Sequence, residues 1–218
     1  MKRKLLTAGA SLAIIMSCGN METSNPFLTD SKAPFGAPEF DKIQNEHYLP
    51  AFEQGIAEAK AEIDAIVANT EEPTFENTIE AMENSGRTLN KVAGVFYNLM
   101  EANTNDQMQE IAEKVAPMMT EYSMYVSLND ALFQKVKAVY EKKDELGLDK
   151  DQMTLLEDNY KSFVRGGANL SDEDKELYSK WSEELSLATL QFSKNVLAAT
   201  NAYTLHITDS ADLAGLPE

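Results

Sequence analysis

The chain has 218 residues, of which 43% are hydrophobic and 25% are charged, and its formal net charge is −17 at pH 7. This length and composition are typical of a globular protein with one large or two small domains and enough apolar residues for a buried core. A surface this acidic repels the phosphates of nucleic acids and anionic lipid headgroups, so we expect neither as a partner.

The first residues have the features of an export signal. Basic residues at 2–4 are followed by an uncharged, mostly apolar run over 5–16. That run is shorter than the roughly twenty residues that span a bilayer, and it matches the apolar part of a signal peptide. It ends in Ile15-Met16-Ser17-Cys18, which resembles the processing site of bacterial lipoproteins, where the cysteine becomes the lipid-modified N-terminus.

We therefore expect 1–17 to be a signal peptide of the lipoprotein type and Cys18, the only cysteine of the chain, to be lipidated. The protein is then expected in the cell envelope, exported and facing the periplasm, with membrane contact only through its lipid anchor. A plain secretory signal with an incidental cysteine is the alternative. With a single cysteine the chain has no disulfide framework.

Residues 18–37 are rich in Ser, Thr, Asn, Pro and Gly, which predicts a tether in front of a helical domain over 38–203. The first helix of that domain is predicted from apolar residues in alternating steps of three and four. These are Leu49, Phe52, Ile56, Ala59, Ile63 and Ile66.

Thr74 is the predicted N-cap of a second helix, which follows the break at Pro73. Its apolar period continues without interruption through Phe75, Ile79, Met82, Gly86, Leu89, Phe96 and Leu99. A third helix is predicted to begin at Thr104 or Asn105, and Pro117 within it predicts a kink or a break.

Three further helices complete the predicted all-α fold. The fourth begins near Asn129, the fifth covers about 150–164 and stops at Gly166-Gly167, and Ser171 caps a long sixth helix. The apolar stripe of the sixth helix is predicted to be its inner face, with Leu177, Trp181, Leu185, Ala188, Phe192, Val196 and Ala199.

The end of the chain has a different pattern. Apolar and polar residues alternate over 203–208, which is typical of a β-strand. We therefore expect the helical domain to end in the start of a strand, and 204–218 to be the beginning of a following unit. Within this sequence that strand has nothing to pair with.

Glu76, Glu80 and Glu83 would lie along one side of the second helix and are the first candidates for a metal or acid–base site. Carboxylate metal sites in helical bundles pair Glu with a His three residues later, and none of these glutamates has one. Each follows an apolar residue of the stripe, so we interpret them as the solvated edge of a scaffold helix.

Other chemistry has equally little support in the sequence. The two histidines, His47 and His206, are far apart and belong to no H-E-x-x-H run, and His47 is interpreted as a capping or hydrogen-bonding residue. No G-x-S-x-G elbow or phosphate-binding loop is present. We therefore identify no catalytic or metal-binding residue and expect this chain to bind no cofactor.

Several runs, in order along about 25–218, resemble the N-terminal region of bacterial peptidyl-dipeptidases of the Dcp type. These enzymes are thimet oligopeptidase-like zinc metallopeptidases. The runs are FDKI (40–43), EHYLPAFEQG (46–55), PTFENTI (73–79), ANTN (102–105), LNDALF (128–133), FVRGGANL (163–170), NVLAA (195–199) and DLAGLP (212–217).

The resemblance implies a largely helical fold that forms one wall of a deep channel. The channel admits short peptides, and the enzyme releases dipeptides from the C-terminus of these peptides. It also implies a zinc ion held by H-E-x-x-H and a downstream Glu, all beyond the region matched here. The chain is thus expected to be the N-terminal scaffold part of such an enzyme, inactive by itself. A stand-alone helical lipoprotein that binds peptides or partners without catalysis is the alternative.

Overall fold

The structure is a computed structural model that describes residues 25–215. The chain is all-α over this range, as predicted, and 25–215 contain no β-strand. The helices are α1 (Tyr48–Ala68), α2 (Ala81–Glu83), α3 (Arg87–Ala102), α4 (Asp106–Ser127), α5 (Asp130–Glu141), α6 (Lys150–Arg165) and α7 (Asp172–Ala202). A π-helical turn, Phe75–Glu80, leads into α2, and 3₁₀ turns occupy Pro34–Gly36, Asn45–His47 and Ser210–Leu213.

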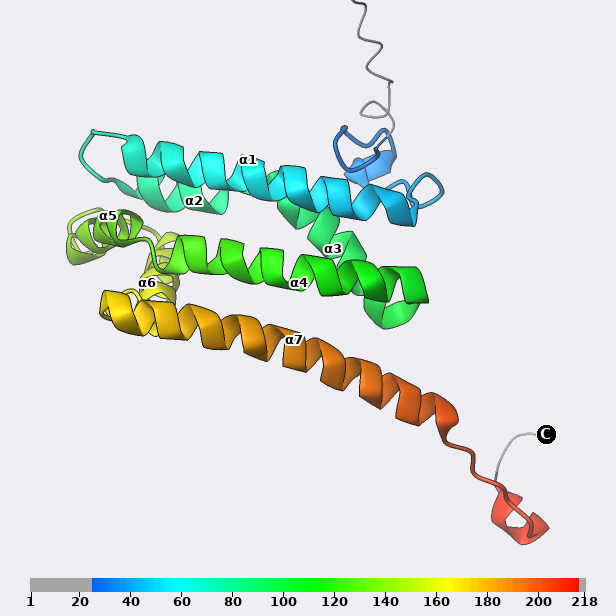
Figure 1. Cartoon of the computed structure of the whole chain (residues 1–218). Helices are drawn as coiled ribbons and strands as arrows, with labels where there is room; N and C mark the ends of the chain where they lie inside the picture. The colour runs from blue at the N-terminus through cyan, green and yellow to red at the C-terminus, as the bar shows by residue number, and fades with distance from the viewer. Residues whose placement is uncertain (1–24, 216–218) are drawn as a thin grey trace, which may run out of the picture.

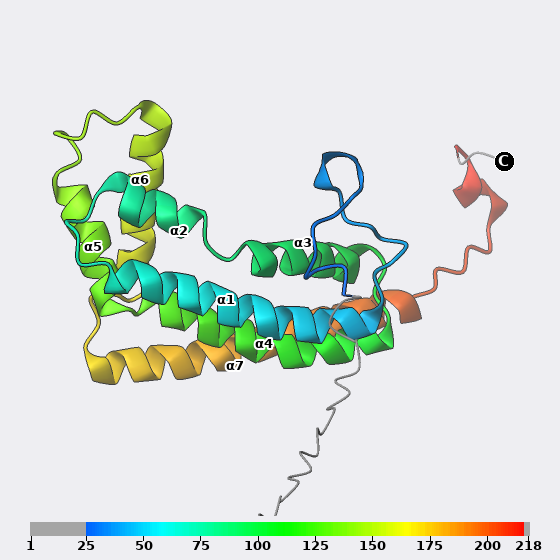
Figure 2. The same ribbon diagram turned by 90° about the horizontal axis from the view of Figure 1, so that it is seen from above.

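Three long helices, α1, α4 and α7, lie side by side as a layer (Figure 1). Viewed from above, α2 and α3 follow one another along one side of α1, and α5 and α6 close one end of the layer (Figure 2). From that end α7 runs back along α4, and the tail after it leaves the body (Figure 1).

One core cluster joins α1, α3 and α4. Tyr48 and Phe52 of α1 meet Phe96 of α3 edge to face, with ring centroids 4.9 and 5.5 Å apart. Met108 and Val115 of α4 are buried in the same cluster. Burying each of these large side chains stabilises the fold by about 1.5–3 kcal/mol, so this cluster holds the three helices together.

A second core cluster lies at the other end of α1. Ile63 packs there with Ile79 of the π-helical turn, Leu132 of α5 and Leu156 of α6, and all four are buried. Phe133 stacks on Phe163 with a centroid distance of 5.8 Å. Because α1 contributes residues to both clusters, it connects the two cores of the fold.

The predicted helix starts are confirmed by their caps. The side chain of Thr74 accepts a hydrogen bond from the backbone N–H of Asn77 (3.1 Å), and the side chain of Asn105, rather than Thr104, caps α4. Asn129 and Ser171 cap α5 and α7 in the same way. Each cap satisfies a backbone donor that the first turn of a helix leaves without a partner.

The second predicted helix is not continuous. Gly86 has a φ of 68°, and its backbone N–H donates to Glu62 Oε2 at 2.6 Å. Glycine adopts this left-handed conformation at little cost, so the chain turns there and α3 begins a new axis. The period persisted across the break because both segments pack on α1.

Of the kink or break predicted at Pro117, the break does not occur, because α4 is a single helix from Asp106 to Ser127. Val115 before the proline is buried, and Met119 after it packs against the same cluster. These contacts hold the helix together across the missing N–H.

The packed body begins before residue 38. Asn25 and Phe27, within the predicted tether, are buried, and Phe27 lies 5.4 Å from the ring of Tyr48. Lys91 Nζ donates to the carbonyl oxygens of Pro26 and Thr29 (3.0 and 2.6 Å). The buried ring of Phe27 and the hydrogen bonds from Lys91 thus hold residues 26–29 against α1 and α3, although the composition of this segment is that of a loop.

The predicted strand over 204–208 does not form. Tyr203 has extended backbone angles, φ −75° and ψ 130°, and the residues after it have no strand partner within 25–215. A strand is stabilised by pairing with a neighbour, and the described chain offers none.

In the described part of the chain, no helix has the length and apolar character needed to cross a membrane. The predicted signal peptide and Cys18 lie outside the described residues.

Candidate docking surface

The face of α7 that was predicted to be its inner face is exposed, so that prediction is wrong for this chain. Leu177 is 42% exposed, Trp181 60%, Leu185 67%, Phe192 68% and Val196 48%. Ala188 and Ala199 are exposed as well, and no residue of α7 is buried. We call the seven residues of this stripe the apolar face of α7.

A different side of α7 packs on α4. The partly shielded positions recur about every three or four residues and are mostly small or polar: Lys175, Tyr178, Ser179, Ser182, Ser186, Leu190 and Lys194. Leu185 is 67% exposed, whereas the adjacent Ser186, about 100° further around the helix, is partly shielded. Serines let two helices approach closely, but they bury little apolar surface.

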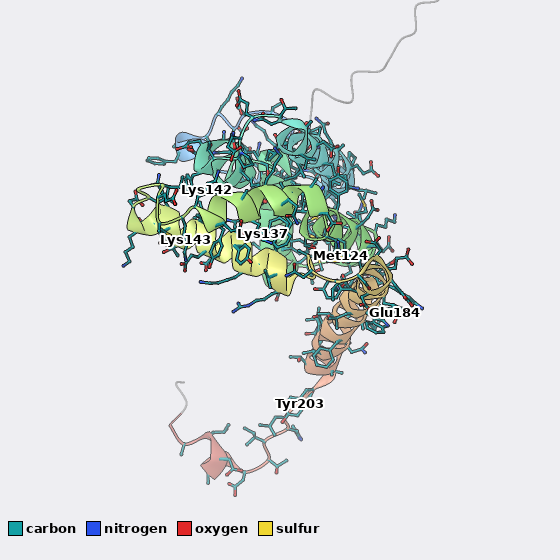
Figure 3. All side chains as sticks on the ribbon, turned by 90° about the vertical axis from the view of Figure 1, so that its left-hand side faces the viewer. Met124, Lys137, Lys142, Lys143, Glu184 and Tyr203 are labelled. Carbon is teal, nitrogen blue, oxygen red and sulfur yellow. The ribbon has the colours of Figure 1, made fainter. Side chains whose placement is uncertain are left out.

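The hold of α4 on α7 is therefore modest. Lys194 pairs with Glu113 of α4, whereas Lys175 pairs with Asp130 of α5 at 2.5 Å. Partly exposed ion pairs of this kind stabilise by about 1 kcal/mol or less. A hollow of about 470 Å³ remains between the two helices, lined by Met124 and Glu183 among others. Figure 3 shows Met124 on α4 and Glu184 on α7.

Charge is distributed unevenly along α7. Its first half carries Asp172, Glu173, Asp174, Glu176, Glu183 and Glu184. Lys194 is the only charged residue over 185–202, and it is paired with Glu113. Five turns of helix with almost no charge and a row of exposed large apolar side chains are unusual for a surface that water covers.

The tail continues this exposed apolar surface. Tyr203 is 72% exposed, Leu205 67% and Ile207 37%, and Figure 3 shows Tyr203 where the chain leaves α7. In an extended segment these alternate residues share one side. The helix face and the apolar side chains of the tail are thus both without a cover in the described chain.

The three glutamates lie as predicted. Glu76, Glu80 and Glu83 are exposed, whereas the neighbouring Phe75 and Ile79 are buried at 5% and 0% exposure. Within 25–215, no group of three His, Cys, Asp or Glu side chains is placed to hold a metal ion. The carboxylates are thus a solvated helix edge.

His47 is a capping residue, as predicted, since its Nδ1 accepts a hydrogen bond from the backbone N–H of Gln44 (3.0 Å). His206 is exposed in the tail. The structure brings neither histidine to a carboxylate cluster within 25–215.

A second hollow, of about 480 Å³, lies between α1, α2, α3 and α4 and is lined by Ile63, Met82, Leu89 and Tyr122 among others. Burial, with a smaller contribution from the Glu62 carboxylate, raises the pKa of the Tyr122 hydroxyl. The tyrosine is therefore protonated at neutral pH, and Glu62 is occupied by the N–H of Gly86.

The sequence matches known proteins over most of its length. The profile of the family described as Neurolysin/Thimet oligopeptidase, N-terminal domain, matches residues 52–175, more than half of the chain. Dipeptidyl carboxypeptidase of Escherichia coli is 40% identical over 198 residues, which are 91% of this chain and 29% of that protein.

Two further relatives also match most of this chain. Dipeptidyl carboxypeptidase of Salmonella typhimurium is 38% identical over 89% of this chain, and oligopeptidase A of the same organism is 28% identical over 89%. The chain spans less than a third of the length of each of these relatives.

The family match, the identity to two dipeptidyl carboxypeptidases and the all-α architecture agree with one another. The chain belongs to the neurolysin/thimet oligopeptidase family and corresponds to the N-terminal region of its dipeptidyl carboxypeptidase-type members.

Proposed function

We propose that this chain is the N-terminal scaffold part of an exported zinc metallopeptidase that releases dipeptides from the C-terminus of short peptides. It contributes one wall of the substrate channel, and the catalytic half is supplied by polypeptide outside these 218 residues. Support comes from the 40% identity to a dipeptidyl carboxypeptidase of which this chain spans 29%.

The exposed apolar face of α7 carries the proposal. Phe192 at 68% and Leu185 at 67% exposure leave apolar area in water, and covering such area stabilises by roughly 25 cal/mol per Å². If this chain is one part of a larger enzyme, an exposed apolar face is expected where the rest of that enzyme packs against it. A self-contained helical domain would turn this face toward its own core.

The zinc ion that the family implies does not fit the described residues. A catalytic zinc site needs about three His, Cys or carboxylate ligands around one cavity, and no such group occurs within 25–215. We therefore assign no role in metal binding to residues 25–215, and we expect the purified protein to contain no stoichiometric zinc.

Export and lipidation rest on the sequence of the first eighteen residues. In a bacterial host, incorporation of labelled fatty acid into the wild-type protein but not into Cys18→Ser tests them. Incorporation into neither protein, with a cleaved N-terminus, would support a plain secretory signal.

The coding sequence beyond Glu218 separates the proposal from its alternative. An open frame that continues to an H-E-x-x-H motif is the expected result. A stop codon directly after Glu218, with the short protein present in cells, would instead support a stand-alone helical lipoprotein whose α7 face binds peptides or partners.

A further inference from the structure

We propose that α7 and the tail form a two-part docking element. The apolar face of α7 packs on the polypeptide that follows this region in the complete enzyme, and residues 203–207 add as a strand to the edge of a β-sheet in that polypeptide. The inference rests on the proposed function and names the partner of this surface and its mode of binding.

The helical part is suited to an apolar partner. Leu185, Phe192 and Val196 are exposed at 67%, 68% and 48%, and they recur at the three-and-four spacing of one helix face. The one charge over 185–202, Lys194, is on the side that faces α4 and is bound there to Glu113. A partner can therefore cover this face without burying an unpaired charge.

The tail is suited to strand addition. Its backbone is extended at Tyr203 and Asp209, and between them residues 203–207 alternate large apolar and polar side chains. Extended segments with free N–H and C=O groups pair with exposed sheet edges, and alternate side chains then enter pockets on one side. Within 25–215 there is no strand with which this segment could pair.

The downstream polypeptide is a better occupant than a second copy. It is joined to the tail itself, so its effective concentration at the face is high, and the relatives show how much of it there is, since this chain spans 29% of Escherichia coli dipeptidyl carboxypeptidase. Two copies would bring together two molecules of net charge −17, each with six acidic residues in the first half of α7. The same charge disfavours an anionic membrane.

The test is a fusion of residues 25–218 to the part of Escherichia coli dipeptidyl carboxypeptidase that follows the matched region. Amide hydrogen exchange is measured over 203–208 in the isolated 218-residue chain and in the fusion. We expect unstructured rates in the isolated chain and protection of roughly 100-fold or more in the fusion, as for a paired strand.

Phe192→Glu places a charge on the apolar face, and Gln191→Glu places the same charge one position away on the same turn. In the fusion we expect Phe192→Glu to abolish the protection of 203–208 and Gln191→Glu to retain it. In the isolated chain both variants should unfold like the wild type, because both positions are exposed. If the fusion aggregates, the downstream part is added in trans and the same exchange is measured.

The outcomes separate the two proposals. A fusion that releases dipeptides while 203–208 stay unprotected would overturn the docking element and leave the proposed function intact. A protected segment in a folded fusion that releases no dipeptides would overturn the proposed function alone. Protection that appears in the isolated chain with rising concentration, or on adding neutral phosphatidylcholine vesicles, would assign the face to a second copy or to a lipid surface and contradict the inference.

Discussion

Gly55 lies where α1 packs against α3, and a methyl group on its Cα would be 2.9 Å from the backbone nitrogen and Cα of Leu89. Gly94, on α3, has no atom within 4 Å of the same position. The two residues are both helical glycines, but only Gly55 is needed for two helices to approach closely.

Gly55→Ala should therefore lower the free energy of unfolding by about 1–3 kcal/mol, because α1 and α3 must move apart to accept the methyl group. Gly94→Ala should raise it by about 0.5–1 kcal/mol through its higher helix propensity. Urea unfolding followed by circular dichroism measures both. Equal effects of the two substitutions would contradict the close packing of α1 on α3.

Glu157 on α6 accepts hydrogen bonds from Lys143 (2.7 Å) and Lys161 (3.1 Å). These lysines, Lys143 first, hold the pKa of the Glu157 carboxyl below its ordinary value. A carboxylate whose pKa is lowered by folding stabilises the native state above its unfolded pKa, and this contribution is lost as the pH falls through the folded pKa.

The wild type should thus be more stable than Glu157→Gln at about pH 7, and the difference should be lost as the pH falls through the lowered pKa of the folded state. Urea midpoints of both proteins at stepped pH values measure it. A difference that is independent of pH would show that the glutamine change acts through packing and not through charge.

At the scale of the helix, α7 differs from the others in that its most apolar side has no cover. Phe96 on α3 is fully buried, whereas Phe192 on α7 is 68% exposed. The two side chains are chemically the same, so their substitution compares a core position with a candidate docking position directly.

Phe96→Ala should cost about 3–5 kcal/mol of stability, because it leaves a cavity among α1, α3 and α4. In the isolated chain, Phe192→Ala should change stability by no more than about 0.5 kcal/mol. Thermal or urea unfolding of the two variants checks this. A large loss for Phe192→Ala would mean that the apolar face is already covered in the isolated chain.

Periodicity and cap chemistry predicted most of the helices correctly. Thr74, Asn105, Asn129 and Ser171 could be recognised as caps because their role depends on neighbours within one turn. The helix break at Gly86 could not be predicted, because the apolar period continues through this residue. The structure shows the break in the left-handed φ of 68° at Gly86. Pro117 predicted a kink or a break, and the break does not form because residues on both sides of the proline pack in one core cluster.

The face of α7 could not be assigned from sequence for a different reason. A hydrophobic stripe shows which side of a helix avoids water, but not which element covers it. The serines at 179, 182 and 186 recur at helical spacing on the other side, and this was the signal that α4 packs there. The strand pattern at 203–208 had the same limit, because it predicts an extended segment but supplies no partner.

At the scale of the whole molecule, the described residues form a helical body with two buried cores. The long helix α7 leads from this body into the tail (Figure 1), and its apolar face is exposed. Family membership could be inferred from sequence because the matching runs occur in order along the chain, and it is confirmed by the family match over 52–175. Several of these runs contain helix caps and buried residues, such as Thr74 and Phe75 in the run at 73–79 and Asn129 and Leu132 in the run at 128–133.

Dipeptide release is the measurement that tests this account most directly. The purified 218-residue chain and its fusion to the downstream part of Escherichia coli dipeptidyl carboxypeptidase are incubated with short peptides, with and without a metal chelator. We predict that the fusion releases C-terminal dipeptides in a chelator-sensitive reaction and that the isolated chain releases none. Chelator-sensitive release by the isolated chain would contradict the account, because it would place the catalytic site within these 218 residues.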